Sequence, residues 1–403
     1  MKTPETPFMF HLDRAPADPI LGLTEAFKQD THPDKINLGV GVYQDATGQT
    51  PVLEAVKQAE TFLLEHENSK SYLAIPGVPE LAKETQTLLF GEDHPIIKNA
   101  RAHTAQTPGG TGALRVAADF LKRATENRTV WLSDPSWANH RTIFEAAGFT
   151  VHNYRYYDAA TQGLNEAGLM EDLEAMGQGD TLILHGCCHN PSGIDLTEAA
   201  WQHVAHVAQA KGLICLVDFA YQGFGEGLEE DRAGLHVLLD AGLSLLIASS
   251  YSKNFGLYNE RTGAITVVED DTESALDAFS HIQAAIRAIY SSPPAHGGKI
   301  VATILGQPEL KALWMRELAD MRTRIKSMRQ AFVTGMADRN TGVDFEFINH
   351  QQGMFSFSGL TKAQVEKLRA DNHIYIVGSG RINVAGITPA NLDPLCDAIA
   401  KVL

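Results

Sequence analysis

Cysteine and long apolar runs are both scarce in this sequence of 403 residues. Its cysteines are only Cys187, Cys188, Cys215 and Cys396, too few for a disulfide framework in a chain of this length, which favours a reducing compartment. The first residues contain no apolar core typical of a signal peptide, and no later run approaches the length of a membrane span. We therefore expect a folded protein of the cytoplasm that has no membrane partner.

Positive charge is also in short supply. Lys and Arg number 33 against 49 Asp and Glu, which leaves a formal net charge of −16. A chain this acidic repels nucleic acid and anionic lipid unless a local patch reverses the sign, so we expect no nucleic-acid partner. An anionic small molecule must then be bound by particular arginines. Hydrophobic residues at 44% and charged residues at 20% are ordinary for a globular protein and exclude a disordered chain.

Short apolar runs follow one another from about residue 100 onward, separated by helical stretches such as 197–211. Runs this short, bounded by Gly, Pro, Asn and Asp, are typical of strands in a mostly parallel sheet, which predicts an α/β fold flanked by helices. Several end in a polar residue, and the carboxyl ends of parallel strands share one edge of a sheet. We therefore expect one crevice lined by the ends of these runs, at Asp134, Asn190, Asp218 and Ser250.

A second, smaller α+β domain is predicted after a long amphipathic helix over 314–336. The segment 345–348 ("FEFI") and the segment 354–360 ("MFSFSGL") read as strands, and 361–372 reads as a helix. The turn-rich N-terminal residues are expected to pack beside this domain. We predict a large domain over 49–313 and a small domain made of 1–48 and 314–403.

A glycine-rich turn in "TPGGTGALRVAADFL" (107–121) runs directly into a helical pattern. Free backbone N–H groups and the helix dipole at such a junction favour an anion, most naturally a phosphate. No Gly-Lys-Ser/Thr follows, which excludes a Walker loop, and the dinucleotide fingerprint is only partly matched. Ordinary helix capping is the alternative.

Three further segments carry polar groups that suit a charged ligand. Asp218 ends a buried run, where a carboxylate is costly unless it is paired with a cation or caps the next helix. Asn190 precedes Pro191 in "HGCCHNPSG", and this loop is expected to present the Asn190 amide to a ligand. Vicinal cysteines are poor ligands for one tetrahedral ion, so we expect no metal there.

Lys253 follows a core run in "SSYSKNFGLYNER". Ser250 and Lys253 also match the Ser-x-x-Lys pattern of serine hydrolases, although the partner motifs are absent.

Taken together, these groups suit the binding of pyridoxal phosphate. They are a phosphate site, a carboxylate for a protonated ring nitrogen, an aromatic donor, an amide and an imine-forming lysine. From about residue 8 to its end, the sequence resembles the class I aspartate and aromatic aminotransferases. The segments that carry the resemblance are "AQTPGGTGALRVAADFL", "HGCCHNPSG", "DFAYQGF", "SSYSKNFGLYNER", "SSPPAHG", "GMFSFSGL" and "SGRINVAG". The resemblance implies a fold-type I homodimer that binds pyridoxal 5'-phosphate, with active sites at the subunit interface.

The resemblance also implies a role for individual residues. Lys253 matches the lysine that forms the imine and carries the proton, and Asp218 matches the partner of the ring nitrogen, with His140 behind it. Tyr221 and Asn190 match the groups around the phenolic oxygen, and Trp137 matches the stacking indole. The phosphate cradle is matched by Gly110, Thr111, Ser250 and Arg261, with Tyr72 from the other subunit. Substrate contacts are matched by Gly41, by Arg381 for the α-carboxylate and by Arg287, again from the other subunit, for the side-chain carboxylate.

The implied reaction moves the amino group of L-aspartate to 2-oxoglutarate by a ping-pong mechanism, giving oxaloacetate and L-glutamate. Ile75 stands where aspartate-specific members tend to carry an acidic residue, and Ser192 stands where threonine is more familiar. Transfer from tyrosine or phenylalanine is therefore the first alternative. A non-catalytic module that binds the same cofactor, and the Ser-x-x-Lys hydrolase, are the alternatives from other classes.

Overall fold

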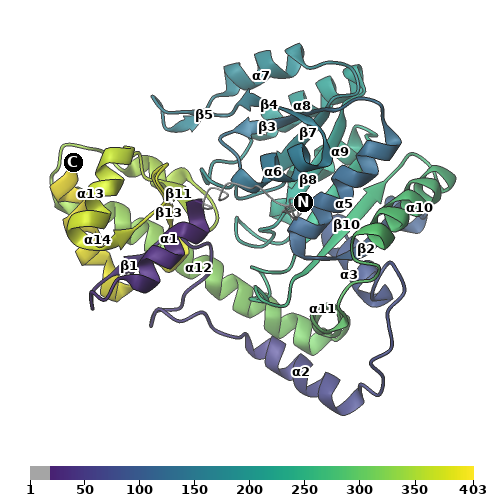
Figure 1. Cartoon of the computed structure of the whole chain (residues 1–403), viewed down its shortest axis with the longest axis horizontal. Coiled ribbons are helices and arrows are strands. Elements are labelled where there is room, and N and C mark those ends of the chain that lie inside the picture. The colour runs from purple at the N-terminus through teal and green to yellow at the C-terminus, as the bar shows by residue number, and fades with distance from the viewer. Residues whose placement is uncertain (1–18) are drawn as a thin grey trace, which may run out of the picture.

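The computed structural model describes residues 19–403 and is built around a seven-stranded sheet (Figure 1). The strands lie in the order β2-β10-β9-β8-β7-β3-β4, and only β10 runs antiparallel to its neighbours. The predicted, mostly parallel α/β sheet is thus confirmed. The strands are β2 (Ala102–Pro108), β3 (Thr129–Asp134), β4 (Thr150–Arg155), β7 (Thr181–His185), β8 (Ile214–Phe219), β9 (Leu245–Ser250) and β10 (Thr262–Val268).

Helices cover both faces of this sheet because its central strands are apolar on both sides. In β8, Leu216 packs into one core cluster while Cys215 and Val217 pack into the other. The first face is covered by α5 (Gly109–Ala124), α6 (Ala138–Ala147) and α10 (Thr272–Ile289). The other is covered by α2 (Glu54–His66), α3 (Pro79–Phe90), α7 (Glu166–Ala175), α8 (Glu198–Lys211), α9 (Ala233–Asp240) and α11 (Ala295–Gly306).

The helix predicted over 197–211 shows why such boundaries can be read from sequence. The Thr197 hydroxyl accepts a hydrogen bond from the backbone N–H of Ala200 and caps the start of α8. Gly212, at φ 60°, ends it in the left-handed conformation that glycine adopts readily.

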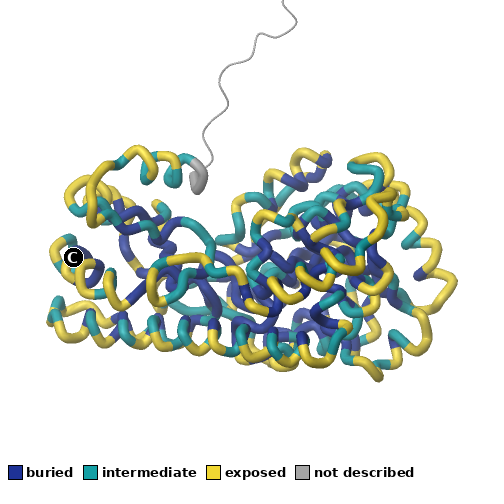
Figure 2. Tube along the Cα trace, turned by 90° about the horizontal axis from the view of Figure 1, so that it is seen from below, coloured by how far each residue is buried: buried dark blue, intermediate teal, exposed yellow. Residues whose placement is uncertain are grey.

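The N-terminal segment packs beside the C-terminal elements, as predicted. β1 (Ile36–Asn37) pairs with β12 (Ile374–Tyr375), and β11 (Phe355–Phe357) pairs with β13 (Arg381–Asn383). These strands lie with α1 (Pro19–Gln29), α13 (Lys362–Asn372) and α14 (Pro389–Val402), to the left of the sheet in Figure 1. Buried residues run through the interior of both groups (Figure 2).

A single helix, α12 (Pro308–Asp338), joins the two groups and contains the predicted helix 314–336. The proposed boundary at 313/314 falls within it, and the division into 49–313 against 1–48 and 314–403 stays a prediction. Part of that division, residues 1–18, lies outside the described residues, as does the start of the resemblance near residue 8. In the described part of the chain, no helix has the length and apolar character required to cross a membrane.

The strand predicted at 345–348 is wrong. Residues Glu346–His350 form a short 3-10 helix, η2. Phe345 and Ile348 are both buried, and their three-residue spacing places them on one side of a 3-10 turn, whereas a strand would turn them to opposite faces. The segment is rich in apolar residues as predicted, but the spacing of its buried residues is that of a 3-10 turn and not of a strand.

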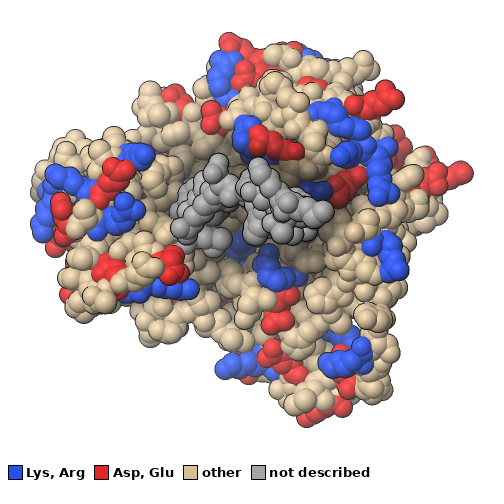
Figure 3. All heavy atoms as spheres, viewed as in Figure 1, with Lys and Arg blue, Asp and Glu red and all other residues tan. Residues whose placement is uncertain are grey.

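The remaining elements are short. They are α4 (Pro95–Lys98), β5 (Tyr157–Asp158), β6 (Gly163–Leu164), η1 (Glu230–Arg232) and η3 (Val384–Gly386). On the face seen in Figure 3, acidic and basic side chains are interspersed, and no broad region of that view carries basic residues alone.

Candidate functional site

A pocket of about 490 Å³ lies where the strand ends meet the C-terminal elements. Its lining residues come from sequence positions as far apart as 40 and 381, and the predicted crevice residues Asn190, Asp218 and Ser250 are among them. Asp134, also predicted there, is exposed at the end of β3 and does not line the pocket. The structure brings the following predicted site residues into this one pocket: Gly41, Gly110, Thr111, Trp137, Asn190, Asp218, Tyr221, Ser250, Lys253, Arg261 and Arg381.

Lys253 lies in the turn after β9 and projects into the pocket. Its Nζ is 4.8 Å from the centroid of the Tyr221 ring and makes no hydrogen bond or ion pair with the described residues. Burial lowers the pKa of Lys253 to about 8, partly opposed by the negative charge of Asp218. A larger fraction of this amine is therefore neutral, and thus nucleophilic, near physiological pH than for an ordinary lysine.

Asp218 is held from behind by a histidine. Its Oδ2 lies 2.9 Å from His140 Nε2, and His140 Nδ1 lies 2.9 Å from the Ser136 hydroxyl. Burial acts to raise the pKa of Asp218, but the hydrogen bond with His140 and the nearby positive groups outweigh it, so the pKa lies below its ordinary value. The carboxylate stays ionised and is suited to hold a protonated nitrogen in the pocket.

The opposite end of the pocket is suited to an anion. Helix α5 begins there at Gly109, and no side chain caps its first N–H groups. Gly109 has φ +70°, and a Cβ at this position would lie 2.7 Å from Arg261 Nη2, so glycine is required for the close approach. Arg261 donates to the Tyr258 carbonyl at 3.0 Å, which directs its guanidinium toward the same helix end.

Arg381 is a buried cation beside Asn190. Its Nη1 donates to Asn190 Oδ1 at 3.3 Å, and its Nη2 donates to the Gly39 carbonyl at 2.6 Å. The guanidinium carbon lies 4.3 Å from the centroid of the Phe355 ring, and Nε is buried without a partner among the described residues. A buried guanidinium that keeps a free donor suits a carboxylate ligand.

Tyr72 and Arg287 are the predicted site residues that the structure does not bring into this pocket. Both line a separate hollow of about 940 Å³, together with Ile75 and Tyr290. Tyr72 is 98% exposed, and Arg287 donates only to the Ser291 hydroxyl four residues away.

Several lining residues were missed from the sequence. Tyr258 and Ser252 stand within "SSYSKNFGLYNER", close in sequence to Lys253, and Phe355 stands within "GMFSFSGL", in a predicted strand of the small domain. These positions were the features of the sequence that could have predicted their place in the pocket. Val40, Leu114 and Ala220 also line the pocket.

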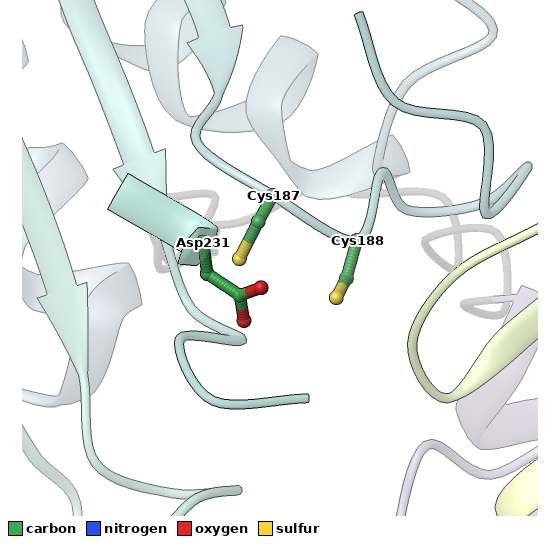
Figure 4. Close-up of side chains that lie close together, drawn as sticks. All are labelled: Cys187, Cys188 and Asp231. Carbon is green, nitrogen blue, oxygen red and sulfur yellow. The ribbon is translucent and has the colours of Figure 1, made fainter. Parts of the chain in front are cut away.

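Two cysteines of the "HGCCHN" segment lie beside a buried carboxylate. The only group with metal-ligating geometry among the described residues joins Cys187, Cys188 and Asp231, within 4.8 Å of one another (Figure 4). Both Asp231 oxygens already accept hydrogen bonds from backbone N–H groups, Oδ2 from Gly223 and Oδ1 from Glu226. The two histidines of the segment lie apart from this group, so the arrangement does not favour a metal.

We expect the reactivity of Lys253 to depend on pH around its lowered pKa. Only the neutral amine attacks a carbonyl, so in the cofactor-free protein the rate of labelling by a small aldehyde should rise through a midpoint near pH 8 and then level off. Mass spectrometry of the labelled peptide measures this rate. A midpoint near 10.5, the ordinary lysine value, would contradict the prediction.

Comparisons with known proteins agree on one family. Residues 33–399 match the model of the family described as aminotransferase class I and II. The aspartate aminotransferase of Salmonella typhi is 56% identical over 98% of this chain and 99% of its own length. The aromatic-amino-acid aminotransferase of Pseudomonas aeruginosa is 45% identical over 96% of this chain and 97% of its own length.

A solved structure supports the fold as well. The aromatic-amino-acid aminotransferase of Burkholderia pseudomallei, covalently bound to pyridoxal phosphate, superimposes with a TM-score of 0.95 at 47% identity, and the alignment covers 98% of each chain.

Proposed function

The chain belongs to the aminotransferase class I and II family, and from this premise we propose that it transfers the amino group of L-aspartate to 2-oxoglutarate. The observation that carries the proposal is the combination, in one pocket, of a lysine with a lowered pKa, an ionised aspartate and a buried arginine: Lys253, Asp218 and Arg381. Three bacterial relatives named aspartate aminotransferase are 51–56% identical to this chain, against 45% for the aromatic-amino-acid aminotransferase of Pseudomonas aeruginosa, which favours aspartate.

The pocket residues fit pyridoxal phosphate. Bound there, the cofactor supplies an aldehyde that takes up the amino group and a protonated ring that accepts the electrons of the broken C–H bond. Asp218 would hold the ring nitrogen, Asn190 and Tyr221 would hold the phenolic oxygen, and Trp137 would cover the ring. The phosphate would be held by the uncapped start of α5, at Gly110 and Thr111, with Ser250 and Arg261.

Lys253 has two tasks in this proposal. Its amine would tether the cofactor until the amino group of the substrate displaces it. The freed Lys253 amine would then take the proton from the substrate α-carbon and give it up again, acting as base and then as acid. Its lowered pKa favours the first task because a neutral amine must be available near physiological pH.

Arg381 binds the substrate α-carboxylate and so orients the C–H bond that is broken. Gly41, in the segment above the pocket, contributes to enclosing the substrate. Arg287 binds the side-chain carboxylate of aspartate from the other subunit. The aromatic alternative is favoured by one observation: Ile75 and Tyr290 line the hollow around Arg287, and both present apolar surface to a substrate side chain.

We propose a homodimer with shared sites, acting in the cytoplasm. The exposure of Tyr72 and the position of Arg287 outside the pocket support this, because each would gain its function only in the partner's pocket, Tyr72 at the phosphate and Arg287 at the substrate.

The first test is the visible spectrum of the cofactor-loaded protein during rapid mixing with L-aspartate and, separately, L-phenylalanine. We expect conversion to the amine form to be much faster with aspartate. In Arg287→Ala, the rate with aspartate should fall about 100-fold, because a charge-assisted carboxylate contact is lost, while the rate with phenylalanine changes little. Comparable rates for both substrates in the unmodified protein would assign it to the aromatic alternative.

Subunit sharing predicts complementation between two impaired variants. In a hybrid of Lys253→Ala and Arg287→Ala subunits, one pocket combines an intact Lys253 with an intact Arg287 from its partner. After joint unfolding and refolding, the mixture should show aspartate activity well above that of either variant alone. Absence of recovery in a mixture shown to contain hybrids would contradict the shared site.

A further inference from the structure

The segment over residues 39–43, here called the roof segment, passes above the pocket, and Val40 and Gly41 line it. The segment forms neither helix nor strand, and its one internal hydrogen bond among the described residues runs from the Val42 N–H to the Val40 carbonyl, at 3.0 Å. The carbonyl groups of Gly39, Val40 and Val42 are bound by side chains of another element, the short strand β13 (Arg381–Asn383).

Two residues of β13 make these contacts. Arg381 donates from Nη2 to the Gly39 carbonyl at 2.6 Å. Asn383 donates from Nδ2 to the carbonyls of Val40 and Val42, at 2.8 Å and 2.7 Å. Residues two apart in a strand point to the same face, so the substrate-binding arginine and this asparagine contact the same segment side by side.

Asn383 is buried, at 1% exposure, and does not line the pocket. Its backbone N–H also donates to the Leu38 carbonyl, at 2.8 Å, so both its main chain and its amide face the N-terminal segment. Its Oδ1 is buried without a partner among the described residues. A buried amide oxygen without a hydrogen-bond partner costs free energy of folding. The amide nitrogen of Asn383, by contrast, makes both of its hydrogen bonds to the roof segment.

The path held by Asn383 leaves little room for adjustment. A Cβ on Gly41 would lie 2.7 Å from Cζ of Phe355, the ring on which the Arg381 guanidinium rests at 4.3 Å. At the C-terminal end of the roof segment, the Tyr43 N–H donates to the Tyr258 hydroxyl at 2.9 Å. A shift of the Val40 and Val42 carbonyls would therefore alter the Gly39 contact of Arg381 and the enclosure of the pocket together.

We propose that Asn383 is a positioning residue for substrate binding: by holding the Val40 and Val42 carbonyls it sets the roof segment and, through the Gly39 carbonyl, the orientation of Arg381 toward the substrate carboxylate. This rests on the proposed aminotransferase function. Asn383 touches neither substrate nor cofactor, so its loss weakens carboxylate binding and leaves the proton transfer by Lys253 largely intact.

The test compares Asn383→Ala and Asn383→Asp with the unmodified, cofactor-loaded protein. Loss of two hydrogen bonds should raise the KM for L-aspartate and the Kd of succinate, a dicarboxylate without an amino group, about tenfold or more. The aspartate variant places an acceptor against two carbonyl oxygens and should be the weaker binder. The kcat should stay within about threefold, and the visible spectrum of the loaded protein should be unchanged.

The matched control is Asn391→Ala. Asn391 also donates its amide to a backbone carbonyl of the same region, that of Gly386 at 3.0 Å, but it makes no contact with the roof segment. Its loss should leave the Kd of succinate unchanged. A succinate Kd within about twofold of the unmodified protein in folded Asn383 variants, or a fall in kcat with KM unchanged, would overturn the proposal.

Hydrogen exchange of the backbone amides in residues 39–43 gives a second measurement. In the unmodified protein, succinate should slow this exchange. If neither Asn383 variant folds, this measurement alone decides: exchange that succinate does not change in the unmodified protein would overturn the proposal. Transamination by the unmodified protein is measured separately. Its absence would count against the proposed function, whereas unaltered succinate binding in the variants counts against the role of Asn383 alone.

Discussion

Replacing Lys253 by alanine is expected to lower the rate of transamination by about 10⁴-fold, the upper range for removal of a positioned acid–base group. No other amine lines the pocket in the described residues: its remaining cationic side chains are Arg261 and Arg381, whose guanidinium groups do not act as bases near neutral pH. The variant should still bind the cofactor, because the phosphate and ring contacts are made by other residues. Stopped-flow absorbance and the steady-state rate with L-aspartate measure the effect.

Two further variants make this result specific. Lys326→Ala removes a lysine that pairs with Glu226 far along α12 and should leave the rate unchanged. Ser250→Ala should weaken cofactor binding and retain turnover when the cofactor is in excess, whereas a Ser-x-x-Lys hydrolase would lose all activity. Full transamination by Lys253→Ala would rule out the proposed mechanism, and a loaded protein that never transaminates would favour the non-catalytic module.

The sequence predicted the pocket well because its residues lie at the ends of short, punctuated strands. Asp218 and Ser250 stand at the carboxyl ends of β8 and β9, which pair directly, so their proximity follows from strand order once the sheet is parallel. The anion site at Gly110 followed from a similar local rule, a glycine-rich turn before a helix.

Other features depend on contacts that no local pattern contains. The pairing of His140 with Asp218 spans 78 positions, and it was expected only from the family resemblance. The place of Tyr258 in the site was not predicted, although it stands near Lys253. Its hydroxyl accepts a hydrogen bond from the Tyr43 N–H, 215 positions away, which no local pattern reveals. Tyr72 and Arg287 show a further limit: in the proposed homodimer their binding partners would lie on another copy of the chain, so contacts within one chain do not reveal the roles proposed for them.

Replacing Asp218 by asparagine is expected to lower the rate of the half-reaction with L-aspartate by about 10³-fold. A carboxylate beside a basic nitrogen favours the protonated form by about one to three pKa units, and the electron-accepting power of the ring depends on that proton. The pKa of Asp218 lies below its ordinary value, so in the unmodified protein the carboxylate is ionised throughout the neutral range. The variant lacks this charge, and raising the pH would only remove the ring proton further, so it should not rescue the loss. Rapid-mixing absorbance at several pH values measures both effects.

Asp195→Asn is the matched control for this variant. Asp195 is a buried carboxylate, but it accepts hydrogen bonds from the backbone N–H groups of Cys188 and His189 and does not line the pocket. Burial raises its pKa to about 6, so its substitution should change stability more than the chemical step. If Asp218→Asn kept the half-reaction within about tenfold of the unmodified rate, the ion pair with the ring nitrogen would not be what drives the proton transfer, and the support that His140 gives to Asp218 would have a structural purpose only.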